Sequence, residues 1–465
     1  MKQVSSKGDI LVNLLSRVPR FAHRIAILCS AVCVCGAPSI AQGAGVVGTG
    51  TAASCTDAAF DDALAGGGLV TFNCGGPAII ESNTKNITVA TTVDGGGLIT
   101  ISGVSGPTFN SAAGIEFAVH NLTIVNSDQW AISTQGGSLI ITHSVFTDNN
   151  RHRSNIPGAI VINGTGTLNV SDSSFTGNGG GIVLMGPGGS GSATITNSTF
   201  ADNDPGMSTF QNDGGAIFNF GWTLTVANST FIGNRSGPNN GGGGIGSDGG
   251  TLTVINCTFS GNSGGGIAGA GVTITNSIFS GNTDNSGNPS RQNCAGTFTD
   301  GGHNLDDGTS CGFSAANGSL SNTNPQLDPA GLQNNGGPTE TVALCTAAGV
   351  PAGCTAASPA IDAGNQSVCA AAPVNDRDQR DYVRPGTGQS HCSIGAYEAD
   401  AMPAGPCIGD CDGSGMVEIN ELILGVNIDL GAQPVSACSA FANAQGKVDI
   451  AQLIKGVKNA LNGCS

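Results

Sequence analysis

One short sequence recurs along this chain at intervals of about 20 to 30 residues. Residues 224–234 read Leu-Thr-Val-Ala-Asn-Ser-Thr-Phe-Ile-Gly-Asn, and close copies occupy 252–262 and 272–282. Looser copies end at Asn149, Asn178 and Asn203. Apolar residues alternate with threonine in each copy and Gly-Asn closes it, which is the pattern of a strand followed by a turn. One such unit cannot bury its own apolar face, so its repetition predicts a solenoid.

A phenylalanine occupies the same position in every copy. The six are Phe146, Phe175, Phe200, Phe231, Phe259 and Phe279. Stacking the copies as parallel strands places Phe over Phe inside a coil. Each buried ring removes about 150 to 250 Å² from water, worth at most about 4 to 6 kcal/mol before chain entropy is subtracted. The fold class predicted is therefore all-β, a coil of parallel strands.

Asparagine also recurs, three residues before the phenylalanine. The four in the clearest copies are Asn197, Asn228, Asn256 and Asn276. Asparagine tolerates the left-handed backbone of a tight corner, and stacked side-chain amides can bond from strand to strand. We expect these residues to form corners and an amide ladder, and to have no further role.

Composition fits such a coil, with 75 glycines and only 10% charged residues. The net charge is −16. The net charge becomes about −20 if the N-terminal residues 1–41, which carry five basic residues and one acidic residue, are removed as a signal peptide. Nucleic acid and anionic membrane surfaces are poor partners for so acidic a chain.

The N-terminus is typical of a signal peptide. A basic segment precedes an apolar stretch at 25–37, and small residues lead up to Ala41, after which we expect cleavage. The signal peptide is thus assigned to residues 1–41, and the mature chain, which has no predicted transmembrane segment, is expected to be secreted or displayed on the cell surface. A lipoprotein is disfavoured because no leader cysteine follows the small residue that lipoprotein processing prefers.

Thirteen cysteines follow the leader, and they fit an oxidising destination. Eight form close sequence neighbours: Cys55 with Cys74, Cys294 with Cys311, Cys345 with Cys354, and Cys369 with Cys392. Four more, Cys407, Cys411, Cys438 and Cys464, allow three pairings. Cys257 replaces the serine of sister copies and is expected to be a small buried side chain. A zinc site is disfavoured because no Cys-x-x-Cys with matching histidines follows the leader.

The motifs near the end of the coil resemble those of a known family. They are 336–342 (Gly-Gly-Pro-Thr-Glu-Thr-Val), 358–364 (Ser-Pro-Ala-Ile-Asp-Ala-Gly), 378–380 (Asp-Gln-Arg), 384–385 (Arg-Pro) and 392–398 (Cys-Ser-Ile-Gly-Ala-Tyr-Glu). Residues 42–398 resemble the choice-of-anchor Q proteins, within the right-handed parallel β-helix superfamily of pectin lyases. The resemblance implies an exported right-handed parallel β-helix without a defined enzymatic activity. Asp381 stands where the family usually has glycine.

The repeats stop at about residue 290, so we assign 42–290 to the β-helix and 291–400 to its end and a disulfide-rich cap. An open coil end exposes unpaired strand edges that need a cover. A charged cluster in this segment suits a salt-bridged cap; it comprises Asp376, Arg377, Asp378, Arg380, Asp381 and Arg384. The alternative is an arginine–carboxylate site for a sugar acid.

After a linker at 401–406, residues 407–465 contain a second duplication with a period of 31 residues. Its first copy has oxygen donors at loop positions 1, 3, 5, 7, 9 and 12, with Gly415 at position 6. The predicted calcium ligands are Asp410, Asp412, Ser414, the Met416 carbonyl, Glu418 through water, and Glu421. The alternative is an acidic surface loop.

The second copy has no carboxylate at positions 1, 3, 5 and 12, where Phe441, Asn443, Gln445 and Gln452 stand. It is expected to pack against the first copy without binding calcium, with Val448 beside Val417. The pair resembles EF-hand and dockerin modules, and that resemblance implies a small helical domain that docks to a cohesin partner.

Catalysis by the coil is the remaining question. Asn282-Thr-Asp284 and Asp306-Asp307 are spaced as in polygalacturonases, but the Gly-His-Gly and Arg-x-Lys of those enzymes are absent. Asp148 and Asp202 form another candidate pair if neighbouring turns bring them together. The leading hypothesis is a non-catalytic exported β-helix with a calcium-binding tail that stabilises it or docks it to a partner. The alternatives are a lyase or hydrolase of acidic polysaccharides and a carbohydrate-binding adhesin.

Overall fold

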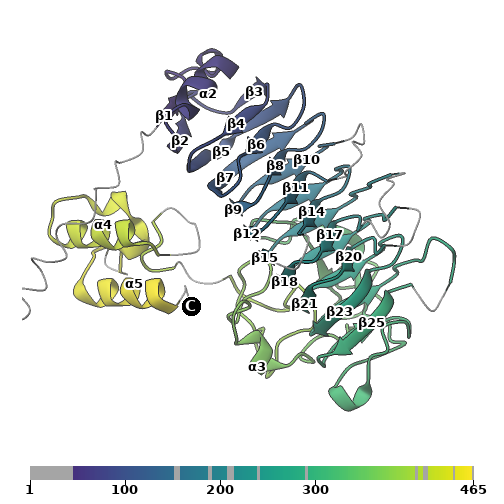
Figure 1. Ribbon diagram of the computed structural model, residues 1–465. Coiled ribbons are helices and arrows are strands. Elements are labelled where there is room, and N and C mark those ends of the chain that lie inside the picture. Colours follow the sequence, from purple (N-terminus) through teal and green to yellow (C-terminus); the bar gives the residue numbers. More distant parts are fainter. Residues whose placement is uncertain are drawn as a thin grey trace, which may run out of the picture. The chain divides into compact units, whose positions relative to one another are not determined.

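The computed structural model describes residues 45–150, 158–186, 191–206, 214–237, 241–288, 292–403, 407–411, 417–443 and 446–462. The predicted signal peptide, 1–41, lies outside them. Most of the described chain winds into a parallel β-helix whose successive turns stack on one another (Figure 1). The predicted all-β coil of parallel strands is confirmed.

The strands form three columns, in which each strand pairs in parallel with its equivalent one turn later. Column 1 contains β1 (Gly45–Val47), β2 (Gly68–Phe72), β5 (Thr91–Gly103), β7 (Ile115–Val125), β9 (Gly137–Thr142), β12 (Gly166–Ser171), β15 (Gly191–Thr196), β18 (Thr223–Ala227), β21 (Thr251–Ile255), β23 (Ile267–Thr275) and β25 (Cys294–Asp300). Column 2 contains β3 (Ala78–Ser82), the later parts of β5 and β7, then β10 (Val145–Thr147), β13 (Ser174–Thr176), β16 (Thr199–Ala201), β19 (Thr230–Ile232), β22 (Thr258–Ser260), β24 (Ile278–Ser280) and β26 (Leu305–Asp306). Column 3 contains β4 (Lys85–Ile87), β6 (Phe109–Ser111), β8 (Ile132–Thr134), β11 (Ile160–Asn163), β14 (Ile182–Met185), β17 (Ile217–Phe220), β20 (Ile245–Asp248) and the first parts of β23 and β25.

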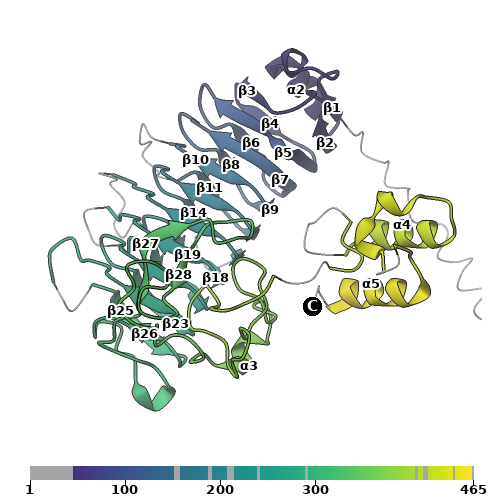
Figure 2. The same ribbon diagram turned by 180° about the vertical axis from the view of Figure 1, so that it is seen from behind.

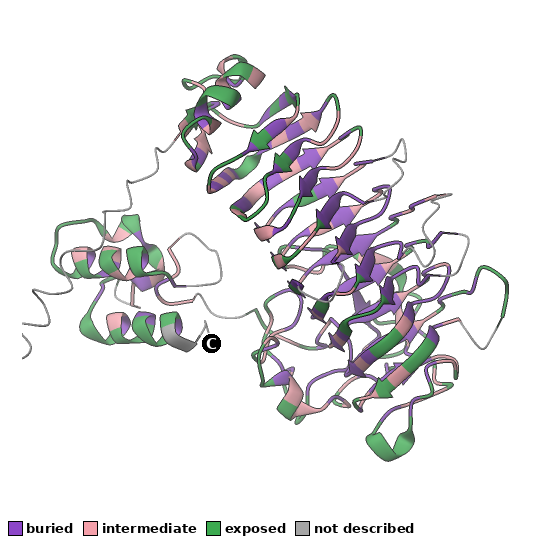
Figure 3. Ribbon diagram, viewed as in Figure 1, coloured by how far each residue is buried: buried purple, intermediate pink, exposed green. Residues whose placement is uncertain are grey.

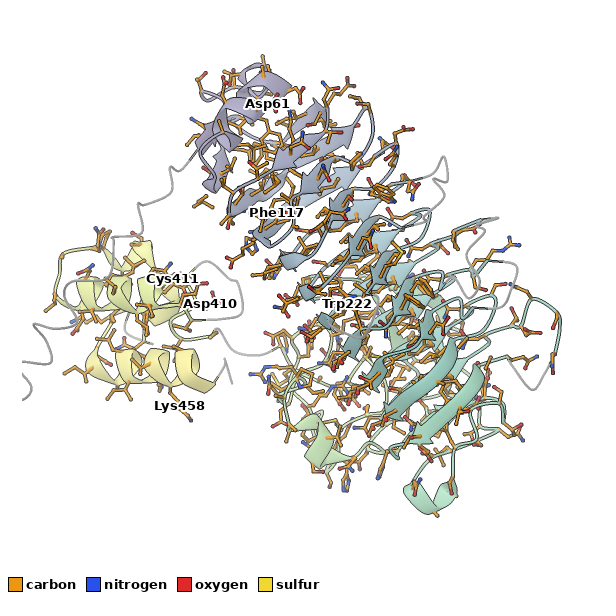
Figure 4. All side chains as sticks on the ribbon, viewed as in Figure 1. Asp61, Phe117, Trp222, Asp410, Cys411 and Lys458 are labelled. Carbon is orange, nitrogen blue, oxygen red and sulfur yellow. A yellow bond between two sulfur atoms is a disulfide. The ribbon has the colours of Figure 1, made fainter. Side chains whose placement is uncertain are left out.

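The six repeated phenylalanines form one stack inside column 2, as predicted. They are fully buried, and neighbouring ring centroids lie 4.6 to 4.9 Å apart with interplanar angles of 1° to 6°. In-register parallel pairing imposes this spacing because it equals the distance between strands. Figure 3 shows the buried stripe along the coil, and Figure 4 shows the side chains, among them the buried Phe117 and Trp222.

Helix α2 (Asp57–Leu64), which the sequence analysis did not anticipate, covers the first turns of the coil. Its Phe60 is buried, with its ring centroid 6.0 Å from that of Phe109. Lys85 of β4 is also buried and forms ion pairs with Asp57 and Asp61, at 2.5 and 2.6 Å. A helix held by an aromatic contact and two ion pairs thus closes this end.

The segment after β26 returns along the outside of column 2 (Figure 2). It contains the antiparallel hairpin β27 (Leu327–Gln333) and β28 (Thr341–Leu344), and the short helix α3 (Gln366–Cys369). The side chain of Gln379 bonds to Thr199, Thr230 and Thr339, which joins this cap to two turns of the coil.

The C-terminal module is a separate cluster built on α4 (Ile419–Asp429) and α5 (Ile450–Asn462). Phe441, the residue at position 1 of the degenerate loop, is fully buried between Gly425 of α4 and Gly456 of α5. A Cβ atom at either glycine would approach the ring to 2.6 or 2.5 Å, so both positions require glycine. Val417 and Val448 are both buried, as expected of packing residues.

The disulfides agree with the cysteine spacing. Four bonds join Cys55 to Cys74, Cys294 to Cys311, Cys345 to Cys354 and Cys369 to Cys392. In the C-terminal module Cys411 pairs with Cys438. Cys407 is also disulfide-bonded, and Cys464 lies outside the described residues. Cys257 is a free, fully buried thiol, as predicted.

We expect Phe200→Ala, in the middle of the stack, to lower the free energy of unfolding by about 3 to 5 kcal/mol, because neighbouring turns cannot close the cavity. Denaturant unfolding followed by intrinsic fluorescence measures the loss. The matched control is Phe220→Ala, since Phe220 is 43% exposed. Equal losses in the two variants would show that the stack does not hold the coil together.

Candidate functional site

A continuous ladder of buried side-chain amides runs along the coil just after the phenylalanine stack. Each Nδ2 donates to the Oδ1 of the next asparagine, at 2.8 to 3.0 Å. The members are Asn149, Asn178, Asn203, Asn234, Asn262, Asn282 and Asn293. All but Asn293 close the copies, whereas the sequence analysis placed the ladder three residues before each phenylalanine.

Each inner member of the ladder has its hydrogen-bonding capacity fully used. Asn234 Nδ2 donates to the Phe200 carbonyl and to Asn262 Oδ1, while Asn234 Oδ1 accepts from the N–H and the Nδ2 of Asn203. A primary amide has two N–H donors and two lone pairs on oxygen, so nothing remains for a ligand. The chain of amides ends on carboxylates, because Asn293 Nδ2 donates to Asp306 and Asp307.

The predicted ladder residues occupy a different corner. Asn197, Asn228, Asn256 and Asn276 all have φ near +50°, so the expectation of left-handed corners is confirmed. Their amides do not form a continuous chain. Asn276 donates to Asn256, but Asn228 donates to the Arg377 carbonyl and Asn256 contacts Cys369 Sγ. Asn228, Asn256 and Asn276 lie where the cap covers this outer corner and bond to the cap, whereas Asn197 donates to Asp172 of the preceding turn.

The same corner contains a titratable pair that the sequence analysis missed. His143 and Asp172 stand three residues before Phe146 and Phe175, have φ of +47° and +51°, and lie on successive turns. Burial raises the pKa of Asp172, and the neighbouring His143 opposes this effect. Alignment of the looser copies on their phenylalanines was the signal that could have found the pair.

The residues that suggested a polygalacturonase have structural partners. Asn282 belongs to the ladder, and Asp284 Oδ2 accepts from Ser286 and Asn288 within its own loop. Asp306 is buried at the end of the phenylalanine column, in register with Phe279. Burial raises the pKa of Asp306, against hydrogen bonds from Gly308 and Asn293.

Asp148 and Asp202 do not come together. They occupy equivalent corners two turns apart, separated by Gly177. Two strand spacings put their backbones about 10 Å apart. The Asp148 carboxylate leans over Gly177 of the following turn, where a Cβ atom would lie 3.0 Å from its Oδ1. His303 Nδ1 lies 2.8 Å from the Ala363 carbonyl, which joins the end of the coil to the cap.

The arginines and carboxylates of the cap are mostly internal. Arg380 pairs with Asp378 at 2.6 Å, and its guanidinium lies 4.0 and 3.7 Å from the ring centroids of Tyr382 and Tyr397. Arg384 and Glu398 form an ion pair at 3.2 Å with both side chains fully buried. Such closed pairs favour the salt-bridged cap over a sugar-acid site.

Asp381 has φ of +64° and pairs with Arg377 at 3.2 Å. The turn therefore has the left-handed backbone that suits the glycine expected from the family resemblance.

In the C-terminal module, three of the predicted calcium ligands, Asp412, Ser414 and Met416, lie outside the described residues. Asp410 and Cys411, both labelled in Figure 4, precede them in the chain, and Glu418 and Glu421 follow them. Glu421 lies in the first turn of α4, is 4% exposed, and accepts hydrogen bonds from the N–H groups of Cys411 and Glu418 at 2.6 and 2.7 Å. A buried carboxylate thus reaches across to the residue beside Asp410.

Within the described ranges, no three His, Cys, Asp or Glu side chains converge on a point where they would hold a metal ion. In the degenerate loop, Asn443 bonds to Lys447 and Asp449. Phe441 and amide side chains stand at its ligand positions, which disfavours a cation there.

Both helices of the module also carry aliphatic side chains on their outer faces, a feature that the sequence analysis passed over. The exposed fractions range from 43% to 77%, for Ile419, Ile423, Val426, Leu430, Ile450, Ile454 and Val457. The 31-residue duplication was the available signal, because it repeats the spacing of the first three residues in the last three.

Comparison of the chain with protein-family models, curated proteins and solved structures finds no match. In the part of the chain that the structure describes, no helix is both long and apolar enough to span a membrane.

We expect Asn234→Ala to lower the free energy of unfolding by about 2 to 4 kcal/mol, because it leaves buried partners of the ladder without hydrogen bonds. Chemical denaturation quantifies the effect. Asn169→Ala, at an exposed position of β12, is the control and should be nearly neutral. A ladder that contributes to stability is ruled out if the two variants unfold alike.

Asp300 gives the end of the coil a dependence on pH. Burial by itself raises the pKa of Asp300, but hydrogen bonds from Ser314, Asn304, Ser319 and Gly302 outweigh it and hold the pKa below its ordinary value. The stabilisation is therefore present above about pH 4 and is lost as pH falls through the lowered folded-state pKa.

We expect Asp300→Asn to flatten the acid limb of a plot of stability against pH, measured by thermal unfolding from neutral to acid pH. Asp62→Asn, an exposed position of α2, should leave that limb unchanged. A steep acid limb retained in Asp300→Asn would contradict the assignment.

Proposed function

We propose that this chain is a non-catalytic exported β-helix protein of the choice-of-anchor Q type. We further propose that its C-terminal EF-hand or dockerin-like module binds calcium and stabilises the chain or docks it to a partner at the cell surface. The single observation that carries the calcium proposal is the position of Glu421. The carboxylate expected to complete the calcium shell is buried in the first turn of α4 and is directed back to the start of the loop.

The chemistry of this donor set supports the proposal. Calcium takes six to eight oxygen ligands and is well served by a loop that begins with an aspartate and ends with a bidentate glutamate. The Cys411 and Glu418 N–H groups donate to the two Glu421 oxygens, which positions this carboxylate at the start of the loop. Asp410, Asp412, Ser414, Met416 and Glu418 would supply the other ligands. The Cys411–Cys438 disulfide joins the calcium loop to the second copy, so the module has a second means of staying folded.

The coil supports a structural role. Its recurring polar residues are used in the amide ladder, the corners and contacts with the cap, and the candidate acid pairs are separated or bonded elsewhere. Among the described residues Cys257 is the one free thiol; burial raises its pKa to about 12, so it stays protonated at neutral pH. Several disulfides fit an oxidising, extracytoplasmic destination.

We expect the mature chain to bind calcium at one site and Asp410→Ala to lose that binding, measured by calorimetric titration of the metal-stripped protein. Asp449→Asn is the matched control, because Asp449 occupies in the degenerate copy the position that Glu418 has in the first. The proposal is wrong if the unaltered chain releases no binding heat, or if the two variants bind alike.

A separate assay tests the non-catalytic role. The mature protein is incubated with a panel of acidic polysaccharides, and reducing ends and unsaturated products are measured. New products would establish the lyase or hydrolase alternative, while retention on immobilised glycans without turnover would establish the adhesin.

A further inference from the structure

The outer faces of α4 and α5 carry two equivalent apolar stripes, here called the α4 stripe and the α5 stripe. The α4 stripe consists of Ile419, Ile423, Val426 and Leu430, with exposed fractions of 77%, 56%, 43% and 74%. The α5 stripe consists of Ile450, Ile454 and Val457, with exposed fractions of 69%, 63% and 45%. Spacings of four, three and four residues place each stripe along one side of its helix.

Packing within the module does not require these stripes. On the opposite side of α4, Gly425 and Ile428 are buried, and Gly425 meets Phe441. On α5, Gly456 meets the same ring, while Gln452 and Asn459 are buried and Asn459 donates to the Ile408 carbonyl. Helix α4 is thus apolar on two opposite sides, and among the described residues of the module only one of these sides has a partner.

The size of the exposed surface points to an interface. The two stripes together expose apolar surface on the order of several hundred Å². That equals the largest apolar patches on ordinary monomers, and it approaches the ~800 Å² that each partner contributes to a standard interface. Isolated exposed aliphatic residues need no explanation, but seven of them at duplicated positions do.

The charges of the module indicate what covers the stripes. The first copy, residues 407–437, carries five acidic residues and no basic residue, and two of them, Glu418 and Asp429, are exposed at the two ends of α4. The second copy, 438–465, carries Lys447, Lys455 and Lys458 against the single Asp449. Lys455 and Lys458 are exposed on α5, and Figure 4 shows Lys458 extending away from the helix. Two α4 stripes facing each other would bring acidic groups together, whereas an α4 stripe facing an α5 stripe brings opposite charges together.

We propose that the partner of the stripes is a second copy of this chain, with α4 of each chain packed on α5 of the other. This inference rests on the docking role proposed above and names the partner. The α4-to-α5 contact then forms twice, once in each direction, which gives the closed two-fold, isologous arrangement typical of dimers.

Sedimentation velocity of the mature full-length chain over the micromolar range tests the proposal. We expect a dimer, and we expect Ile423→Asp and Ile454→Asp each to raise its dissociation constant at least about tenfold, because each places a charge in the apolar contact. Ile79→Asp is the matched control: Ile79 is 72% exposed on β3, and the substitution should not change the dimer. Far-UV circular dichroism verifies that the variants fold.

Mixing the two variants gives a sharper readout. In the reciprocal dimer, the α5 stripe of the Ile423→Asp chain and the α4 stripe of the Ile454→Asp chain are both intact. The mixture should therefore form a heterodimer where each variant alone is monomeric. Lys458→Glu should weaken the dimer at low salt and have little effect at high salt.

The inference is overturned if the unaltered chain is monomeric at every concentration. It is also overturned if the Ile423→Asp and Ile454→Asp chains each dimerise with an unchanged dissociation constant. An Ile454→Asp chain that dimerises normally beside a monomeric Ile423→Asp chain overturns the α4 to α5 pairing. Calcium titration is independent of these results: a chain that binds calcium but stays monomeric refutes the dimer alone, and a dimer that binds no calcium refutes the calcium proposal alone.

Discussion

Parallel pairing in exact register is the constraint on which the rest of this structure depends. When each strand bonds to its equivalent one turn later, every side chain lies about 4.8 Å from its own counterpart. Like side chains must then be compatible with themselves. Phenylalanine satisfies this by stacking face to face, and asparagine by donating to its successor while accepting from its predecessor.

The same constraint limits what the coil can do chemically. An amide in the ladder has no spare hydrogen-bonding capacity, and a carboxylate repeated on successive turns would repel its own copies. Carboxylates therefore occur where the repeat ends, as with Asp306 and Asp307, or where glycine separates them, as with Asp148 and Asp202. Asp172 is instead placed between unlike side chains and accepts from Asn197 of the next turn. The polar residues in the cap motifs are likewise used in internal contacts. Gln379 bonds to the coil, and Arg380 and Arg384 form closed ion pairs.

The phenylalanine stack, the left-handed corners and four local disulfides were predictable because each depends on residues at fixed spacing. The amide ladder was assigned to the wrong asparagines. Two sets of asparagines, one before and one after the phenylalanines, recur with the same period. Their spacing alone does not tell which set has its side chains inside the coil. Asn234 is enclosed after the phenylalanine strand, whereas Asn228 lies on the outside and bonds to the cap.

By itself, the sequence determined the repeat, the strand register it permits, the local cysteine pairs and the duplication of the C-terminal module, because these are relations between residues at fixed offsets along one chain. The tertiary structure alone decided that α2 closes the first turns and that the cap returns along column 2. It also decided that Phe441 fills the centre of the module while the stripes of α4 and α5 stay exposed. Those outcomes depend on which surfaces meet, and contacts between distant segments, such as Thr230 with Gln379, leave no periodic trace in the sequence.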